Sequence, residues 1–396
     1  ALDLTQPSRS RLLSLLTEAC ELEHGLACSY LFSAFSIKQD VNEGGLTWKQ
    51  LQSARLWASE IYMVAAEEML HLAQAWNLLA AVGGEPYYLR PNFPQKRTYY
   101  GFDLPLALEP FGASALRRFI AYETPADQLE PFPTSQSNDD APARYKSVGE
   151  LYGLIRDQII ALPENELFFP GVGQMGPEIT HFPDLIPISG RQSAIAAIDL
   201  ITEQGEGTDI DRGDSHFAVF QRTLNAYLDE RTIDPQFEPA RPVLKNPVPR
   251  IRGDWNIEGR VNLITDPLAS RLGDLFDDVY SLIMRLLQHA FAEGPAGPVA
   301  ASFCDAAINA MTTVIKPLGE GLALLPSGRS DGSRAGASFG LTRHVTLPTP
   351  ARIARTVAAE RSRELANEAA LLAEIPNVPA QIRIASNNLK QIAEKL

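Results

Sequence analysis

Residues 65–76, AAEEMLHLAQAW, place a glutamate and a histidine three positions apart in a stretch that otherwise has the apolar pattern of a buried helix. Side chains at that spacing project from one face of a helix and lie about 5 to 6 Å apart. An unpaired carboxylate in a protein core costs several kcal/mol. Glu68 and His71 therefore need a buried partner, and a metal ion is the partner that this pair of residue types suits.

The first third of the chain has the pattern of two long helices, at residues 10–38 and 47–81. Apolar residues recur three and four positions apart in both, as on the buried face of a helix. Glu23 lies on the apolar face of the first helix. Thr47 and Gln50 have the spacing of a capping box that begins the second helix. Because strand signal is sparse along the whole chain, the predicted class is all-α.

The remaining chain has further helical segments separated by loops. Residues 83–146 are rich in proline and aromatic side chains and predict a long insertion that covers a site. The sequence predicts a bundle over residues 1–235 and a helical C-terminal domain over residues 236–396, after a linker rich in proline. The other predicted helices are 147–162, a fourth that begins near residue 190 and ends at the glycines of GEG, a further segment from 215, and 267–293, 299–324 and 350–375.

Glu-x-x-His is the paired motif of ferritin-like bundles that bind two metal ions, in which other helices supply further glutamates. Glu23, on the first helix, is placed to bridge two ions, one of them held by Glu68 and His71. The fourth helix offers Glu203 and Glu206, again three apart, for the other ion. A solvated acidic edge is the alternative for these two residues.

Glu150 is a further candidate ligand on the third helix, although Ser147 and Glu150 also fit a capping box that would only close their own helix. His216 begins the segment after the fourth helix, where a turn could return its imidazole to the missing histidine position. Its alternative is a packing role. Tyr30, two turns beyond Glu23, is either a core residue or a phenol that donates hydrogen bonds or electrons beside a redox metal.

Composition limits the classes of function. The formal net charge of the 396 residues is -13, which argues against a nucleic-acid or anionic-membrane partner, since both need a basic face. No apolar run approaches the roughly 20 residues that cross a bilayer, so we expect a cytoplasmic protein that binds metals and small molecules. Ligand sets rich in oxygen suit iron, or manganese, better than zinc.

Several segments resemble the ferritin-like domain of the iminophenyl-pyruvate dimer synthases of bisindole pigment pathways. The resemblance covers about residues 10–230 and extends more weakly into the second half. This chain is shorter than those synthases, and Glu206 stands where the ferritin pattern has a histidine. The segments that carry the resemblance are ELEHGLACSYLFSAFSIK, AAEEMLHLAQAWNLLAAVGGEP, SVGELYGLIRDQI, and AIDLITEQGEGT followed by SHFAVF.

The resemblance implies a ferritin-like four-helix bundle and an iron-dependent oxidative step on an imine derived from an amino acid. It places Glu23, Glu68, His71, Glu203 and Glu206 at the matching positions. The leading hypothesis is a non-haem, di-iron oxidoreductase that uses O2 or peroxide on a small organic substrate, as a homodimer or with another enzyme of its pathway. The alternatives are a metal-storage protein and a metal-free scaffold that binds partners.

Overall fold

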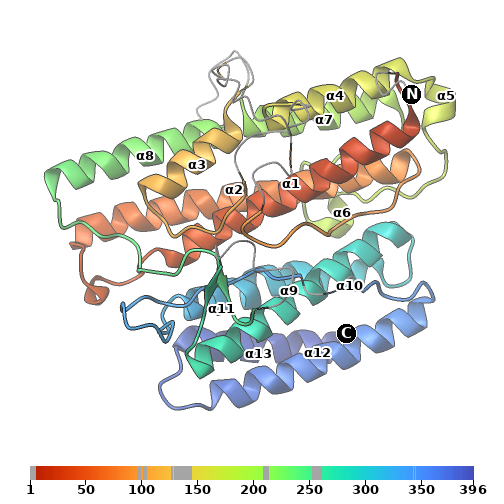
Figure 1. Cartoon of the computed structure of the whole chain (residues 1–396). Helices are drawn as coiled ribbons and strands as arrows, with labels where there is room; N and C mark the ends of the chain where they lie inside the picture. The colour runs from red at the N-terminus through yellow and green to blue at the C-terminus, as the bar shows by residue number, and fades with distance from the viewer. Residues whose placement is uncertain are drawn as a thin grey trace.

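The computed structural model of the chain shows two stacked layers of helices (Figure 1). Helices α1 to α4, α7 and α8 form one layer, and α9 to α13 form the other. The all-α prediction is confirmed. The structure describes residues 6–95, 100, 105–125, 128, 145–207, 214–251, 261–341, 343 and 345–396.

Two long helices, α1 (Arg9–Ser36) and α2 (Trp48–Ala81), pack along each other and carry the centre of the first layer. The predicted capping box is present, because the Thr47 side chain accepts from Gln50 N and the Gln50 side chain accepts from Thr47 N. Ser8 caps α1 in the same way by accepting from Arg11 N. A short 3-10 turn, η1 (Val41–Glu43), connects the two helices.

The bundle has two further columns, each made of two shorter helices placed end to end. One column is α3 (Ala113–Glu123) followed by α4 (Val148–Ala161), and the other is α7 (Arg191–Gly205) followed by α8 (His216–Ile233) (Figure 1). Between the columns, α3 packs against α8 and α4 packs against α7. Both columns are interrupted near the middle of α1 and α2, so four helix ends meet there (Figure 1). Helix α3 lies within the segment that the sequence predicted to be an inserted loop. Two single-turn helices, α5 (Glu164–Leu167) and α6 (Pro177–Thr180), lie between α4 and α7 in the chain.

The second layer begins with α9 (Pro267–Glu293), whose bounds match the prediction. The predicted helix 299–324 is divided into α10 (Ala300–Ala310), a π turn η3 (Met311–Ile315) and α11 (Lys316–Leu322). The π turn ends two residues before Pro317, whose ring and missing N–H disrupt regular helical hydrogen bonding. Helix α12 (Ala351–Ala373) was predicted, whereas α13 (Ala380–Lys395) was not.

The segment predicted to be a linker hydrogen-bonds to both layers. Ala240 pairs with Ile37 at the end of α1, and Val243 pairs with Arg334. The two-residue strands β1 (Pro247–Val248) and β2 (Asn262–Leu263) pair in parallel, with Pro247 opposite Asn262. Buried apolar side chains of the two layers form one continuous core. The division into domains at residue 235 stays a prediction.

Polar side chains also join the layers. His24, next to Glu23 on α1, points to the second layer, where its Nδ1 lies 2.7 Å from the Tyr88 carbonyl and its Nε2 meets the Tyr280 hydroxyl. Arg90 donates to the same hydroxyl at 3.1 Å and to the Phe339 carbonyl at 2.7 Å. His24 on α1 thus helps to hold the layers together, whereas Glu23, about 100° further around the helix, is turned into the bundle. None of the described helices is both long and apolar enough to span a lipid bilayer.

Candidate metal centre

A first cluster of ligand side chains consists of Glu23, Glu68 and His71. Glu68 and His71 lie one turn apart on α2, and Glu23 reaches them from α1. His71 Nδ1 is 3.5 Å from Glu68 Oε2 and 3.7 Å from Glu23 Oε2. All three residues are only 1% exposed. The side chains of Glu23, Glu68 and His71, which the sequence predicted to lie on the apolar faces of two helices, therefore meet at one point in the core.

A second cluster consists of Glu68, Glu123 and His216. Glu123 ends α3 and His216 begins α8, where Ser215 caps the helix by accepting from Ala218 N. His216 Nδ1 is 2.8 Å from Glu68 Oε1 and 3.8 Å from Glu123 Oε2. In each cluster the three ligand atoms lie within 4.8 Å of one another. Glu68 belongs to both clusters, so it occupies the shared position that the sequence assigned to Glu23.

Both imidazoles are oriented by a partner on their outer nitrogen. His71 Nε2 is 2.9 Å from Gln204 Oε1, and His216 Nε2 is 2.9 Å from Glu67 Oε2. These contacts turn Nδ1 of each ring toward the cluster. A hydrogen-bonded outer nitrogen is the usual arrangement of histidine ligands, since it sets the tautomer and the orientation of the ring.

Two buried tyrosines hold the outer carboxylates. The Tyr152 hydroxyl donates to Glu23 Oε1 at 2.6 Å, and the Tyr30 hydroxyl donates to Glu123 Oε1. Burial raises the pKa of both phenols well above the ordinary value, and the carboxylates beside them add to the rise. Both tyrosines therefore stay protonated and act as hydrogen-bond donors.

The clusters have an excess of negative charge that the histidines partly compensate. Burial by itself would lower the pKa of His71, but Glu23 and Glu68 outweigh it and raise that pKa to about 10. The pKa of His216 also rises well above its ordinary value, because Glu68, Glu123 and Glu67 outweigh burial. Burial, together with Glu68, raises the pKa of Glu23 to about 7. The carboxylates thus stabilise positive charge at both imidazoles, which a bound metal ion would supply in place of the two protons.

The donor atoms also fit a metal ion. Glu68 Oε2 and His216 Nδ1 are buried and make no hydrogen bond with the described residues, although His216 Nδ1 lies close to Glu68 Oε1. Buried polar atoms without a partner are rare and call for an explanation. Each cluster offers two carboxylates and one imidazole, a set that suits iron or manganese. Either ion would coordinate these two atoms, which make no hydrogen bond with the described residues.

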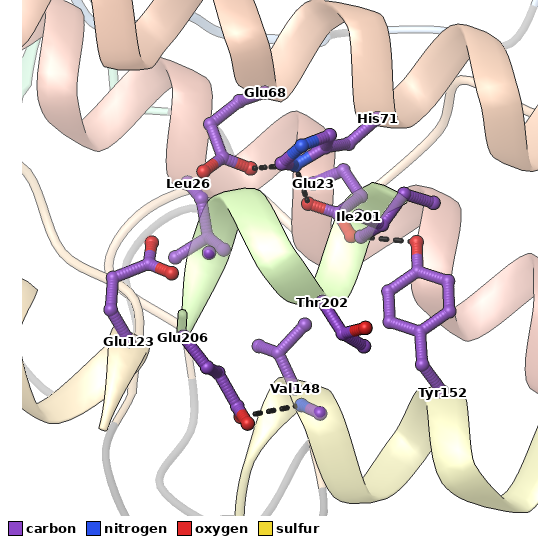
Figure 2. Close-up of a pocket in the computed structure, with 12 residues that line it drawn as sticks. Glu23, Leu26, Glu68, His71, Glu123, Val148, Tyr152, Ile201, Thr202 and Glu206 are labelled. Atoms are coloured by element: carbon purple, nitrogen blue, oxygen red, sulfur yellow. Dashed lines mark hydrogen bonds and ion pairs between the residues drawn. The ribbon is translucent and has the colours of Figure 1, made fainter. Parts of the chain in front are cut away.

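A small cavity adjoins the clusters (Figure 2). Its volume of about 10 Å³ is close to the minimum that holds one water molecule. Its lining includes four carboxylates, from Glu23, Glu68, Glu123 and Glu206, and none of the described lining residues is a lysine or an arginine. The cavity therefore has room for a bare ion or one small ligand molecule beside the carboxylates.

Comparison with known proteins places the bundle in a family. A family model described as Ferritin-like matches residues 16–225, which contain both clusters. The chain belongs to the ferritin-like family. The predicted ferritin-like fold and the family resemblance are thereby confirmed.

Two relatives of this ferritin-like chain are biosynthetic enzymes by name. It is 32% identical to a dichlorochromopyrrolate synthase from Lentzea aerocolonigenes over 93% of its own length. It is 31% identical to a 2-imino-3-(indol-3-yl)propanoate dimerase from Chromobacterium violaceum over 81% of its length. The chain spans 40% and 33% of the lengths of these two relatives. Among solved structures, a ferritin-like protein from Caulobacter vibrioides is 20% identical to this chain, with a TM-score of 0.53. The match covers 83% of this chain and 98% of the Caulobacter protein, which shows a common fold.

The structure places the other predicted ligands of this ferritin-like bundle differently. Glu206 lines the cavity, but its carboxylate accepts the Gly149 N–H at 2.9 Å and lies outside both clusters. Glu203 is half-buried and is not among the residues that line the cavity. Glu150 accepts the Lys146 N–H at 2.6 Å, and Ser147 caps Glu150 N, so Glu150 closes its own helix.

Glu123 was missed by sequence reasoning because it lies in the segment that was predicted to be a loop. A signal was present, since Leu116, Phe119 and Glu123 are spaced three and four apart, as on one helical face. Gly205 at the end of α7 also leaves room for this carboxylate, because a Cβ there would lie 3.3 Å from Glu123 Oε2. Tyr152 and Gln204 were missed as well, and a single sequence contains no pattern that identifies such outer partners.

Proposed function

We propose that this protein is a non-haem iron oxidoreductase whose buried centre holds two ions. The first cluster would hold one ion, the second cluster the other, and Glu68 would bridge them. The observation that carries the proposal is the convergence of buried carboxylates and imidazoles on Glu68, where two buried ligand atoms make no hydrogen bond with the described residues. The proposed ligand set omits Glu150, Glu203 and Glu206.

Bound iron would supply the oxidation of a small organic molecule by dioxygen or peroxide; manganese would suit the same ligands. The residues of the chain prepare the site for this chemistry. Tyr152 holds one oxygen of Glu23 so that the other faces His71, and Tyr30 holds Glu123 in the same manner. The ligands themselves are buried away from bulk water, which strengthens the electrostatic interactions among them.

The names of the relatives support a substrate class. One relative is named for the dimerisation of an imino acid that carries an indole ring, and the other for the synthesis of dichlorochromopyrrolate. We therefore propose an amino-acid-derived imine as the substrate, in natural-product biosynthesis. A homodimer partner or a second pathway enzyme is part of the proposal.

Elemental analysis and oxidant consumption test the proposal. We expect protein expressed with iron to retain about two iron ions per chain, and the loaded protein to consume dioxygen or peroxide faster when an indole-containing imino acid is supplied. Free iron at the same concentration is the control. A protein that binds no iron, or that consumes neither oxidant above this control, would contradict the proposed function.

A further inference from the structure

The cavity beside the clusters has a buried floor and a more exposed rim. Glu23, Glu68 and His71 on the floor are 1% exposed. Thr202, Gly149 and Glu206, which line the other side, are half-buried. Figure 2 shows Glu206 across the cavity from Glu68 and His71. Among the described residues, this more exposed side of the cavity lies between the end of α7 and the start of α4.

The size of the cavity restricts how an ion can enter. A hydrated divalent cation of this kind has an octahedral shell of about six oxygen ligands. A volume of about 10 Å³ accommodates about one water molecule. The ion must therefore exchange its water ligands for protein oxygens while it is still at the rim.

Glu206 is the carboxylate that lies at this rim. Its Oε1 accepts the Gly149 N–H at 2.9 Å in the first turn of α4, where the helix dipole favours a negative charge. A Cβ at position 149 would overlap this carboxylate. Glycine at 149 thus lets Glu206 lie against the helix backbone while it still faces the cavity.

The destination of an entering ion is visible on the floor. Glu68 Oε2 is buried, lines the cavity and has no hydrogen-bond partner among the described residues. The described lining residues include four carboxylates, one imidazole, that of His71, and no lysine or arginine. The lining between Glu206 and Glu68 therefore offers carboxylate oxygens beside the apolar side chains of Leu26, Val148 and Ile201.

We propose that Glu206 is the transfer ligand that receives a divalent cation at the rim, replaces part of its water shell and passes it to the two clusters. This role rests on the proposed function, in which the clusters hold iron. Glu206 is then required for the rate of loading and not for the final number of bound ions. The role differs from that of a resident ligand, which would change the final number.

Stopped-flow loading of the metal-free full chain with Co²⁺ alone tests this role, because cobalt absorbance reports binding without turnover. Glu206→Gln keeps an oxygen that accepts the Gly149 N–H but removes the charge. We expect this variant to load at least tenfold more slowly than the wild type and to reach the same final stoichiometry. Thermal unfolding of the metal-free variant should match that of the wild type.

Asp199→Asn is the matched control, because it removes one charge from the same helix seven residues earlier, where Asp199 pairs with Arg156 at the surface. We expect this control to load at the wild-type rate. Equal slowing in both variants would assign the effect to net charge and overturn the role of Glu206. A wild-type rate in Glu206→Gln, or a lower final stoichiometry, would also overturn it. Failure of the wild type to bind Co²⁺ would instead contradict the proposed function itself.

Discussion

The two clusters contain the same residue types but are built from different parts of the chain. The first cluster stands on α1 and α2, two long unbroken helices, within residues 23–71. The second cluster joins Glu68 to the last residue of α3 and the first residue of α8. A local spacing on α2 supplies two of the three ligands of the first cluster, whereas the second cluster exists only because two helix ends meet near Glu68.

The outer partners of the clusters differ in charge. Gln204, which is neutral, holds His71 in the first cluster, whereas Glu67, which is acidic, holds His216 in the second. A carboxylate on the outer nitrogen makes an imidazole a stronger ligand. The comparison therefore predicts two inequivalent ions, with tighter binding in the second cluster.

Replacement of the shared carboxylate should have the largest effect. Glu68→Gln removes a ligand of both clusters, so we expect iron content to fall at least tenfold from about two ions per chain. Metal analysis of the purified variant measures this, with Asp199→Asn as the control for the loss of one charge. Retention of a single ion at full occupancy would show that the two clusters do not share Glu68.

Replacing each histidine in turn should distinguish the ion of the first cluster from the ion of the second. We expect His71→Ala to lose the ion of the first cluster and His216→Ala to lose the ion of the second, so that each variant retains about one ion. Titration of the metal-free variants with Co²⁺ gives the stoichiometry. If either variant retained two ions, its histidine would not be a ligand.

Changing the charge of either outer partner, Glu67 or Gln204, should reduce the difference in metal affinity between the two clusters. Glu67→Gln is expected to weaken the ion of the second cluster about tenfold, because outer partners of histidine ligands contribute ten- to hundredfold to metal affinity. The mirrored Gln204→Glu should strengthen the ion of the first cluster. Isothermal titration with Co²⁺ should show two steps in the wild type that approach each other in either variant. Unchanged steps would contradict the assigned inequivalence.

Asp277, a buried carboxylate outside both clusters, tests whether burial of a carboxylate is by itself enough to affect the iron content. Asp277 on α9 accepts hydrogen bonds from Ser338 Oγ and from the Gly340 N–H at 2.8 Å, and neither of these partners is a histidine. Burial raises its pKa to about 7, although these hydrogen bonds oppose the rise. We expect Asp277→Asn to leave the iron content unchanged.

The effect of Asp277 on stability should depend on pH. Its pKa is higher in the folded than in the unfolded protein, so its contribution is complete below about pH 4 and declines as pH rises to about 7. The free energy of unfolding of the wild type, relative to Asp277→Asn, should fall by about 4 kcal/mol over this range. Chemical denaturation of both metal-free proteins at several pH values measures the difference. Parallel pH profiles would show that this carboxyl is not protonated in the fold.

Much of the fold follows from local patterns in the sequence. The periodicity of apolar residues predicted α1, α2, α4, α7, α9 and α12 to within a few residues, because burial of one helical face repeats every three to four positions. The same rule placed Glu23, Glu68 and His71 on apolar faces. Helix α13 was missed although Ile382, Ala385 and Leu389 have this spacing, because small and polar residues separate them.

The sequence by itself determined that acidic and imidazole side chains face the interior of a helical bundle, since helical periodicity is a property of neighbouring residues. Only the tertiary structure decided which of them meet. Glu123 and His216 converge because two interrupted columns place their helix ends at the level of Glu68. Glu150 and Glu206 instead accept backbone N–H groups at the start of α4. Periodicity gives the face of a side chain but not its height along a neighbouring helix, and that height depends on packing between residues far apart in the chain.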